Sequence, residues 1–138
     1  MEETISIIIA EDKELFRTIL VRELASFNIR TIAQADNGLE LVEHLHGLVP
    51  DVVLLDLEMP VMDGTTTLEM LSTNFPKVKV IILSAHYEST LADHFMGKGA
   101  RGFVPKDAIS GNIKVLADAI RSVKQTGSYR YQKAALKK

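Results

Sequence analysis

Acidic residues directly follow two of the most apolar runs in this sequence. Glu11 and Asp12 come after the run 5–10, and Asp56 comes after the run 52–55. Carboxylates that are brought together repel one another unless a cation neutralises them. Oxygen-only ligands favour Mg²⁺, and the absence of histidine and cysteine beside these residues disfavours Zn²⁺. The pattern predicts a magnesium site, with the alternative that each acid simply ends a strand in solvent.

A hydroxyl and an ammonium group complete this candidate site. Ser84 and Lys106 also follow short apolar runs. Lysine offers a point charge to a phosphoryl oxygen, serine offers a hydrogen-bond donor, and a carboxylate beside a metal can act as a nucleophile to give an acyl phosphate. In phosphoryl transfer the protein mainly positions the reactants and stabilises charge. Neither a P-loop nor a G-x-G-x-x-G pattern occurs in the sequence, so we expect an already activated phosphoryl donor in place of ATP.

Runs with strand character and runs with helical apolar spacing alternate along the chain. The predicted strands are 5–10, 30–35, 52–55, 78–83 and 103–104, and the predicted helices are 14–27, 39–48, 65–75, a weaker one around 91–95, and 113–123. This alternation predicts an α/β fold with a doubly wound, five-stranded parallel sheet covered by helices on both faces. Ligands bind outside the carboxyl ends of such strands, where the strand order reverses. We therefore expect the five site residues to meet there.

The composition is that of one ordinary folded domain. The chain has 138 residues, 46% hydrophobic and 25% charged, and no cysteine, so it has neither a disulfide nor a cysteine nucleophile. The acidic start and the lack of an apolar run of about 18 residues argue against a signal peptide and a membrane span, so we expect a cytoplasmic protein. Residues 1–63 hold thirteen acids and four bases, and residues 64–138 hold five and twelve. This split indicates acids gathered at one place, not a general nucleic-acid-binding surface.

Residues 5 to about 125 resemble the receiver domains of bacterial two-component response regulators. The resemblance is carried by Glu11-Asp12, the run Asp56-Leu57-Glu58-Met59-Pro60-Val61-Met62-Asp63-Gly64, Ser84-Ala85 and Lys106-Asp107. It implies the flavodoxin-like (βα)5 receiver fold. The last predicted helix, Leu116 to Val123 followed by Gly127, resembles receivers that precede a LuxR-type helix-turn-helix output domain.

The resemblance also implies a role for each site residue. Asp56 would accept the phosphoryl group. Asp12, Asp56 and the backbone carbonyl of Glu58 would bind Mg²⁺, with Glu11 helping through a water molecule. Ser84 and Lys106 would hold the phosphoryl oxygens.

Some positions depart from the pattern of the family or leave its role open. Phe103 occupies the switch position where many members carry tyrosine, so a switch by Ser84 and Phe103 stands beside a plain core role for Phe103. Many members have a proline after the lysine in a cis peptide, whereas here Pro105 precedes Lys106, and the sequence leaves the isomer of the Val104–Pro105 bond open. Glu58 and His86 are candidates for tuning the phosphoryl lifetime, with solvated loop residues as the alternative.

The resemblance predicts a phosphoacceptor domain in two-component signal transduction. We expect Asp56 to take a phosphoryl group from a sensor histidine kinase or a histidine phosphotransfer protein in a phosphorelay. The fold would then switch conformation and control an output, and the likeness of the last helix points to transcription regulation as that output. This would be a signalling domain, not an enzyme, although it takes part in its own phosphorylation and autodephosphorylation. The alternatives are a single-domain regulator and a pseudo-receiver that acts only by docking.

Two further classes share the fold or the chemistry. A flavodoxin-like binder of small phosphate ligands needs a glycine- and serine-rich loop after the first strand, where Glu11 and Asp12 would repel phosphate. A phosphatase of the haloacid dehalogenase type needs an aspartate two residues after its nucleophile, and Glu58 stands there. The sequence disfavours both.

We expect a receiver domain over 1–127 and a basic tail, or the start of a linker to an output domain, over 128–138. A phosphorylation-dependent homodimer would use the face of the helix near 91–95, the strand 103–104 and the last helix, or the first and last helices. DNA would be bound only through an output domain that this chain lacks, and no membrane is involved. The basic residues that could touch phosphates are Arg121, Lys124, Arg130, Lys133, Lys137 and Lys138.

Overall fold

Five parallel strands form one sheet in the order β2-β1-β3-β4-β5. The strands are β1 (Ile5–Ala10), β2 (Ile29–Ala35), β3 (Val52–Asp56), β4 (Val80–Ser84) and β5 (Gly102–Pro105). The structure is a computed structural model, and it describes residues 3–85 and 87–132. The predicted doubly wound α/β fold is confirmed.

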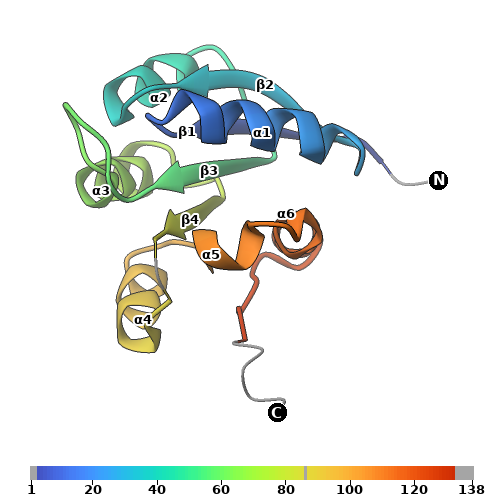
Figure 1. The fold of residues 1–138 in the computed structure, drawn as a ribbon. Coiled ribbons are helices and arrows are strands. Elements are labelled where there is room, and N and C mark those ends of the chain that lie inside the picture. The colour runs from blue at the N-terminus through green and yellow to red at the C-terminus, as the bar shows by residue number, and fades with distance from the viewer. Residues whose placement is uncertain (1–2, 86, 133–138) are drawn as a thin grey trace.

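Helices follow each strand and cover both faces of the sheet (Figure 1). They are α1 (Glu14–Ala25), α2 (Gly38–Leu45), α3 (Gly64–Asn74), α4 (Ser89–Gly97), α5 (Lys106–Ile109) and α6 (Ile113–Thr126). The side chains of Asn37 and Asp63 accept hydrogen bonds from the amides of Glu40 and Thr66, which fixes the starts of α2 and α3. These caps explain why both helices begin one residue earlier than their apolar spacing predicts.

The elements differ from the sequence predictions mainly at their ends. The single turn α5 was not predicted, because four residues carry no helical period. α1 ends at Ala25 and not at residue 27, since Asn28 takes a left-handed conformation (φ 65°) that turns the chain into β2. β4 begins at Val80 and not at residue 78. The described part of the chain has no cis peptide bond, so the Val104–Pro105 bond is trans.

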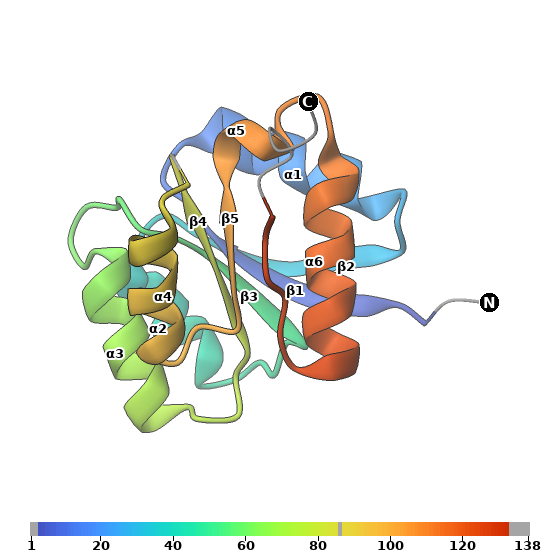
Figure 2. The ribbon, with the colours of Figure 1, turned by 90° about the horizontal axis from the view of Figure 1, so that it is seen from below.

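Alternate residues of the buried strands serve two separate cores. Ile7 and Ile9 of β1 pack with α1 and α6, whereas Ile8 and Ala10 pack with α2, α3 and α4. Figure 2 shows α6 and α1 on one side of the sheet and the other three long helices on the opposite side. Helices therefore exclude water from both faces of the sheet. This explains why the strand sequences are continuously apolar and do not alternate between apolar and polar residues.

The order of the strands reverses at β1. The chain passes from β1 to β2 on one side and then to β3 on the other. The connections leaving β1 and β3 diverge there, so their carboxyl ends border a crevice of the kind in which open α/β sheets bind ligands. Among the described residues, no helix is long and apolar enough to cross a membrane.

Candidate functional site

Three acidic residues meet at the carboxyl ends of β1 and β3. Ala10 pairs with Leu55, so Glu11 and Asp12 leave β1 beside Asp56 at the end of β3. One carboxylate oxygen from each lies within 4.8 Å of the others. Glu11 and Asp56 are buried, and Asp12 is half-buried. The sequence prediction that these acids come together is confirmed.

Lys106 neutralises two of these acids. Its Nζ lies 2.9 Å from Oε1 of Glu11 and 3.1 Å from Oδ1 of Asp56. Lys106 is the first residue of α5, directly after β5, and its Nζ lies over the ring of Phe16, 5.1 Å from the ring centroid. The ring shields one side of the ammonium group and holds it near the carboxylates.

Two carboxylate oxygens of the site are buried with neither a hydrogen bond nor an ion pair among the described residues. They are Oδ1 of Asp12 and Oδ2 of Asp56, whereas Oε1 of Glu11 pairs with Lys106. An unpaired buried carboxylate oxygen is costly, and a hard cation with oxygen ligands would satisfy both at once. The residues present therefore fit Mg²⁺.

The environment makes Asp56 a weaker acid than usual. Burial and the charge of Glu11 raise the pKa of Asp56 to about 6, against the lowering effect of Lys106 and of the Glu58 amide. Burial acts to lower the pKa of Lys106, but the hydrogen bond to Glu11 and the charges of both acids outweigh it, so the pKa of Lys106 is raised. Lys106 is therefore charged at neutral pH, and Asp56 is mostly ionised there.

Ser84 occupies the next strand end along the sheet. Leu83 pairs with Asp56, and Ser84 itself pairs with Pro105, the residue before Lys106. The serine is buried. Ser84 lies at the end of a strand, as the sequence predicts, and the strand order places it between the strand ends that carry the carboxylate and the lysine.

The remaining predicted site residues lie around this centre. The amide of Glu58 donates to Oδ1 of Asp56 at 3.3 Å, while the Glu58 side chain is exposed. Phe103 is buried, stacks on Phe95 and meets the edge of Tyr87. His86 lies outside the described residues.

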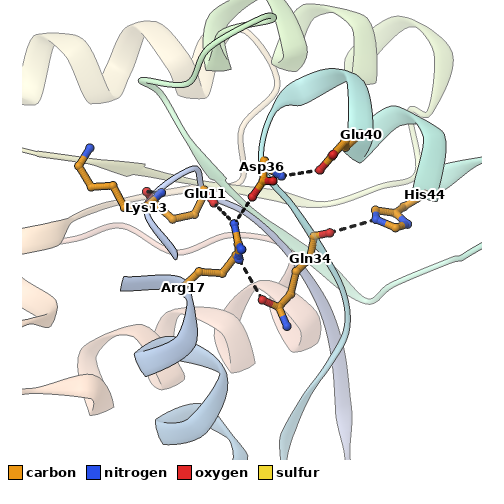
Figure 3. A network of polar contacts seen from close by, with 7 residues as sticks. All are labelled: Glu11, Lys13, Arg17, Gln34, Asp36, Glu40 and His44. Atoms are coloured by element: carbon orange, nitrogen blue, oxygen red, sulfur yellow. Dashed lines mark hydrogen bonds and ion pairs between the residues drawn. The ribbon is translucent and has the colours of Figure 1, made fainter. Parts of the chain in front are cut away.

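A polar network that the sequence analysis missed fixes the loop between β1 and α1 (Figure 3). Arg17 of α1 donates to the carbonyl oxygen of Glu11 at 2.7 Å and to the side chain of Gln34 at 2.9 Å, and forms an ion pair with Asp36. Arg17 thereby connects Gln34 of β2 and Asp36, which follows β2, to Glu11, the residue before Asp12. The only signal in the sequence was a basic residue near a helix start, where the helix dipole disfavours it unless an acid compensates.

The arrangement is suited to binding a phosphoryl group. It places a buried carboxylate that could act as a nucleophile, two further acids that could help to hold a metal, an ammonium group and a hydroxyl at adjacent strand ends. These are charges and donors fixed in place before any ligand arrives, which is how proteins promote phosphoryl transfer.

Comparison with known proteins gives a consistent result. Residues 7–120 match the family described as the response regulator receiver domain. The transcriptional regulatory protein DegU of Brevibacillus brevis is 32% identical over 133 residues, which cover 96% of this chain and 55% of that protein. The chemotaxis protein CheY of Listeria monocytogenes is 32% identical over 102 residues, which cover 74% of this chain and 86% of that protein.

A solved structure agrees with the fold. The signal receiver domain of the putative response regulator NarL from Mycobacterium tuberculosis superposes with a TM-score of 0.75 at 31% identity, covering 87% of this chain and 98% of that one. The chain spans about half the length of DegU and of the full-length NarL relative.

Proposed function

This chain belongs to the response regulator receiver domain family, and we propose that Asp56 is the residue that accepts the phosphoryl group. The observation that supports this assignment most strongly is the position of its carboxylate. It is buried at the strand end, within 4.8 Å of two further acids and 3.1 Å from Lys106. Glu11 shares the burial and the lysine contact, but its Oε1 pairs with Lys106 and its Oε2 accepts from the Lys13 amide, whereas Oδ2 of Asp56 has no such partner.

The reaction is a nucleophilic displacement at phosphorus. A carboxylate oxygen of ionised Asp56 attacks the phosphoryl group of an activated donor, the bond from oxygen to phosphorus forms, and the donor's own bond to phosphorus breaks. The electron pair of that bond leaves with the donor, which is an imidazole nitrogen in a phosphohistidine or an acetate in acetyl phosphate. The product is an acyl phosphate on Asp56.

Asp12, Asp56 and the backbone carbonyl of Glu58 would hold Mg²⁺, with Glu11 acting through a water molecule. When bound, the ion neutralises the clustered acids and the charge on the transferred oxygens. The unpaired oxygens of Asp12 and Asp56 support this ligand set, and so does the Glu58 amide on Asp56, which brings that backbone segment to the site.

Lys106 and Ser84 would hold the new phosphoryl oxygens. Lys106 already touches Asp56, so its ammonium needs only a small movement to pair with an oxygen bonded to that residue. Ser84 would donate its hydroxyl hydrogen from the neighbouring strand end. Movement of Ser84, with Phe103 responding in the core, would convert the chemical change into a conformational one.

Glu58 is the described candidate for setting the lifetime of the acyl phosphate. Its exposed side chain follows the acceptor by two residues, where it can order or exclude the hydrolytic water. His86 has the same proposed role.

The relatives support a proposal about the output of this domain. DegU is named as a transcriptional regulatory protein, so we propose that this domain controls transcription through a region outside this chain, with a histidine kinase or phosphotransfer protein as donor.

Residues 1–127 would form the receiver domain and 128–138 a tail or linker. Phosphorylation would promote a homodimer, DNA would be bound only through an output domain, and the protein would act in the cytoplasm. Of the six basic residues singled out in the sequence, Lys133, Lys137 and Lys138 lie outside the described residues.

Phosphorylation by a small donor tests the proposal. Incubation with acetyl phosphate and Mg²⁺ should add one phosphoryl group to the wild type and none to Asp56→Asn, as measured by intact mass. Asp107→Asn, which changes an exposed acid beside Lys106, is the matched control and should be labelled like the wild type. Equal labelling of Asp56→Asn would eliminate Asp56 as acceptor, and an unlabelled wild type would favour a pseudo-receiver that acts by docking.

A further inference from the structure

The chain turns back after α6 and runs beside β5 (Figure 2). We call residues 127–132 the strap. Gly127 adopts a left-handed conformation (φ 94°) that reverses the chain direction at the end of α6. The amide of Tyr129 then donates to the carbonyl oxygen of Arg101 at 2.9 Å, and the Arg101 guanidinium donates to the carbonyl of Gly127 at 3.0 Å. β5 is an edge strand, so the strap covers an edge of the sheet that would otherwise be open.

The strap contacts both helical layers across this edge. Tyr129 packs with the core that lies under α1 and α6. Tyr131 lies against Tyr87, with ring centroids 5.1 Å apart, and Tyr87 belongs to the core on the other face.

The strap is held by few and weak interactions. The ion pair between Arg130 and Asp93 is 3.6 Å long and exposed on both sides, so it adds little. Ser128, at the turn, is bonded only to Ser122 and Thr126 at the end of α6. Beyond this turn, the strap is held by the pair of hydrogen bonds with Arg101 and by the contacts of two tyrosine rings. A modest change in one ring contact is therefore enough to shift the balance between docked and free strap.

Tyr87 connects the strap to the acidic site. It lies three residues after Ser84 on the loop between β4 and α4, and its ring also meets the edge of Phe103, with centroids 6.2 Å apart. A phosphoryl group on Asp56 that draws the Ser84 hydroxyl toward itself must pull on this loop. Tyr87 then shifts relative to Tyr131, because the strap is held separately by the hydrogen bonds of Gly127 and Tyr129 with Arg101, the residue before β5.

We propose that the strap is an internal ligand of Tyr87 that is docked while Asp56 is unmodified and released when Asp56 carries a phosphoryl group. The inference rests on the proposed phosphorylation of Asp56. Release frees the edge of β5, so the strap carries the signal from the acidic site to the far end of the sheet. Because the coupling is reciprocal, a docked strap must also oppose binding of a phosphoryl mimic.

The absence of tryptophan and cysteine from the chain allows a clean optical test. Tyr131→Trp introduces a single indole at the contact with Tyr87. Adding Mg²⁺ and beryllofluoride, a phosphoryl mimic, should increase quenching of its fluorescence by acrylamide as the strap is released. The same reporter in an Asp56→Asn background should not respond.

A second measurement tests the reverse coupling. Tyr131→Ala removes the ring contact and should raise the affinity for beryllofluoride roughly two- to tenfold, the range expected for one aromatic pair. Tyr131→Phe keeps the ring and is the matched control, so its affinity should equal that of the wild type. Both variants lie outside the acidic site, and their thermal unfolding will show whether the fold is intact.

The outcomes separate this inference from the proposed function. The intact mass of the same proteins after incubation with acetyl phosphate reports phosphorylation independently of the strap. Normal labelling with an unchanged tryptophan signal, or with a lower beryllofluoride affinity in Tyr131→Ala, overturns the release of the strap. Absence of labelling on Asp56 refutes the proposed function and, with it, the trigger for release.

Discussion

The ammonium group of Lys106 lies 3.1 Å from Oδ1 of Asp56, although fifty residues separate the two in the chain. The same group lies 2.9 Å from Oε1 of Glu11. One cation thus serves two buried carboxylates, and Asp12 adds a third acid whose Oδ1 has no hydrogen-bond partner. The site therefore carries an excess of negative charge until a bound cation balances it.

The pH dependence of metal-free stability should show the cost of ionising Asp56. Its pKa is about 6 in the fold and 3.8 as the ordinary value, so the folded state binds more protons between these pH values and stability falls as pH rises through this window. The penalty is fully present above about pH 6. Asp56→Asn should remove it and increase the unfolding free energy at pH 7 by roughly 1–3 kcal/mol.

Denaturant unfolding at pH 5 and pH 7.5 in the presence of a chelator measures this effect. The difference between the wild type and Asp56→Asn should be larger at the higher pH. A difference that is the same at both pH values would show that Asp56 titrates outside this window.

Magnesium should stabilise the fold, because it binds only where the three acids are assembled. At a concentration about ten times Kd the gain is roughly 1–2 kcal/mol, or about 3–6 °C in Tm for a domain of this size. Asp12→Ala should reduce the gain and leave metal-free stability unchanged or higher, since it removes one of three clustered charges. Thermal unfolding with and without Mg²⁺ measures both effects. Glu43→Ala, an exposed acid on α2, is the control and should respond to Mg²⁺ like the wild type.

Removing Lys106 should separate phosphorylation from its consequence. Lys106→Ala leaves Glu11 and Asp56 without their shared cation, so metal-free stability should fall by up to about 3 kcal/mol and recover in part with Mg²⁺. The variant should still accept a phosphoryl group from acetyl phosphate, but hydrogen exchange in the loops after β4 and β5 should no longer change on labelling.

Lys114→Ala supplies the comparison, because Lys114 forms only an exposed ion pair with Asp118. This substitution should lower the unfolding free energy by less than about 0.5 kcal/mol. Unchanged exchange behaviour in Lys106→Ala relative to the wild type would contradict the coupling role of Lys106.

Val61 should be a position where substitution stabilises the fold. It has a φ of 68° on the loop after Asp56, a left-handed conformation that is costly for a β-branched residue, and its side chain is 78% exposed. Val61→Asn should raise the unfolding free energy by about 1 kcal/mol, because asparagine tolerates this conformation. Val49→Asn changes a valine that is 89% exposed and does not have a positive φ, so it should have little effect. Equal effects of the two substitutions would argue against backbone strain at Val61.

The sequence alone determined the order of the elements and the membership of the acidic site. Strands that are buried on both faces must be continuously apolar, and helices on a sheet must repeat their apolar residues at three- and four-residue steps, so β1, β3 and α6 were readable from local patterns. Because parallel strands place their carboxyl ends at one edge, the residues directly after each strand were expected to meet. Glu11, Asp12 and Asp56 do so.

Only the tertiary structure decided which of these groups pair and what covers the sheet edge. The sharing of Lys106 between Glu11 and Asp56, and the bonds from Arg17 to Gln34 and Asp36, join residues from different elements whose side-chain directions depend on packing. The strap has no apolar period, and its contact between Tyr131 and Tyr87 exists only because Gly127 turns the chain back along β5. Such contacts link residues that are distant in sequence and leave no local pattern, so they follow from the packed fold and not from the order of residues.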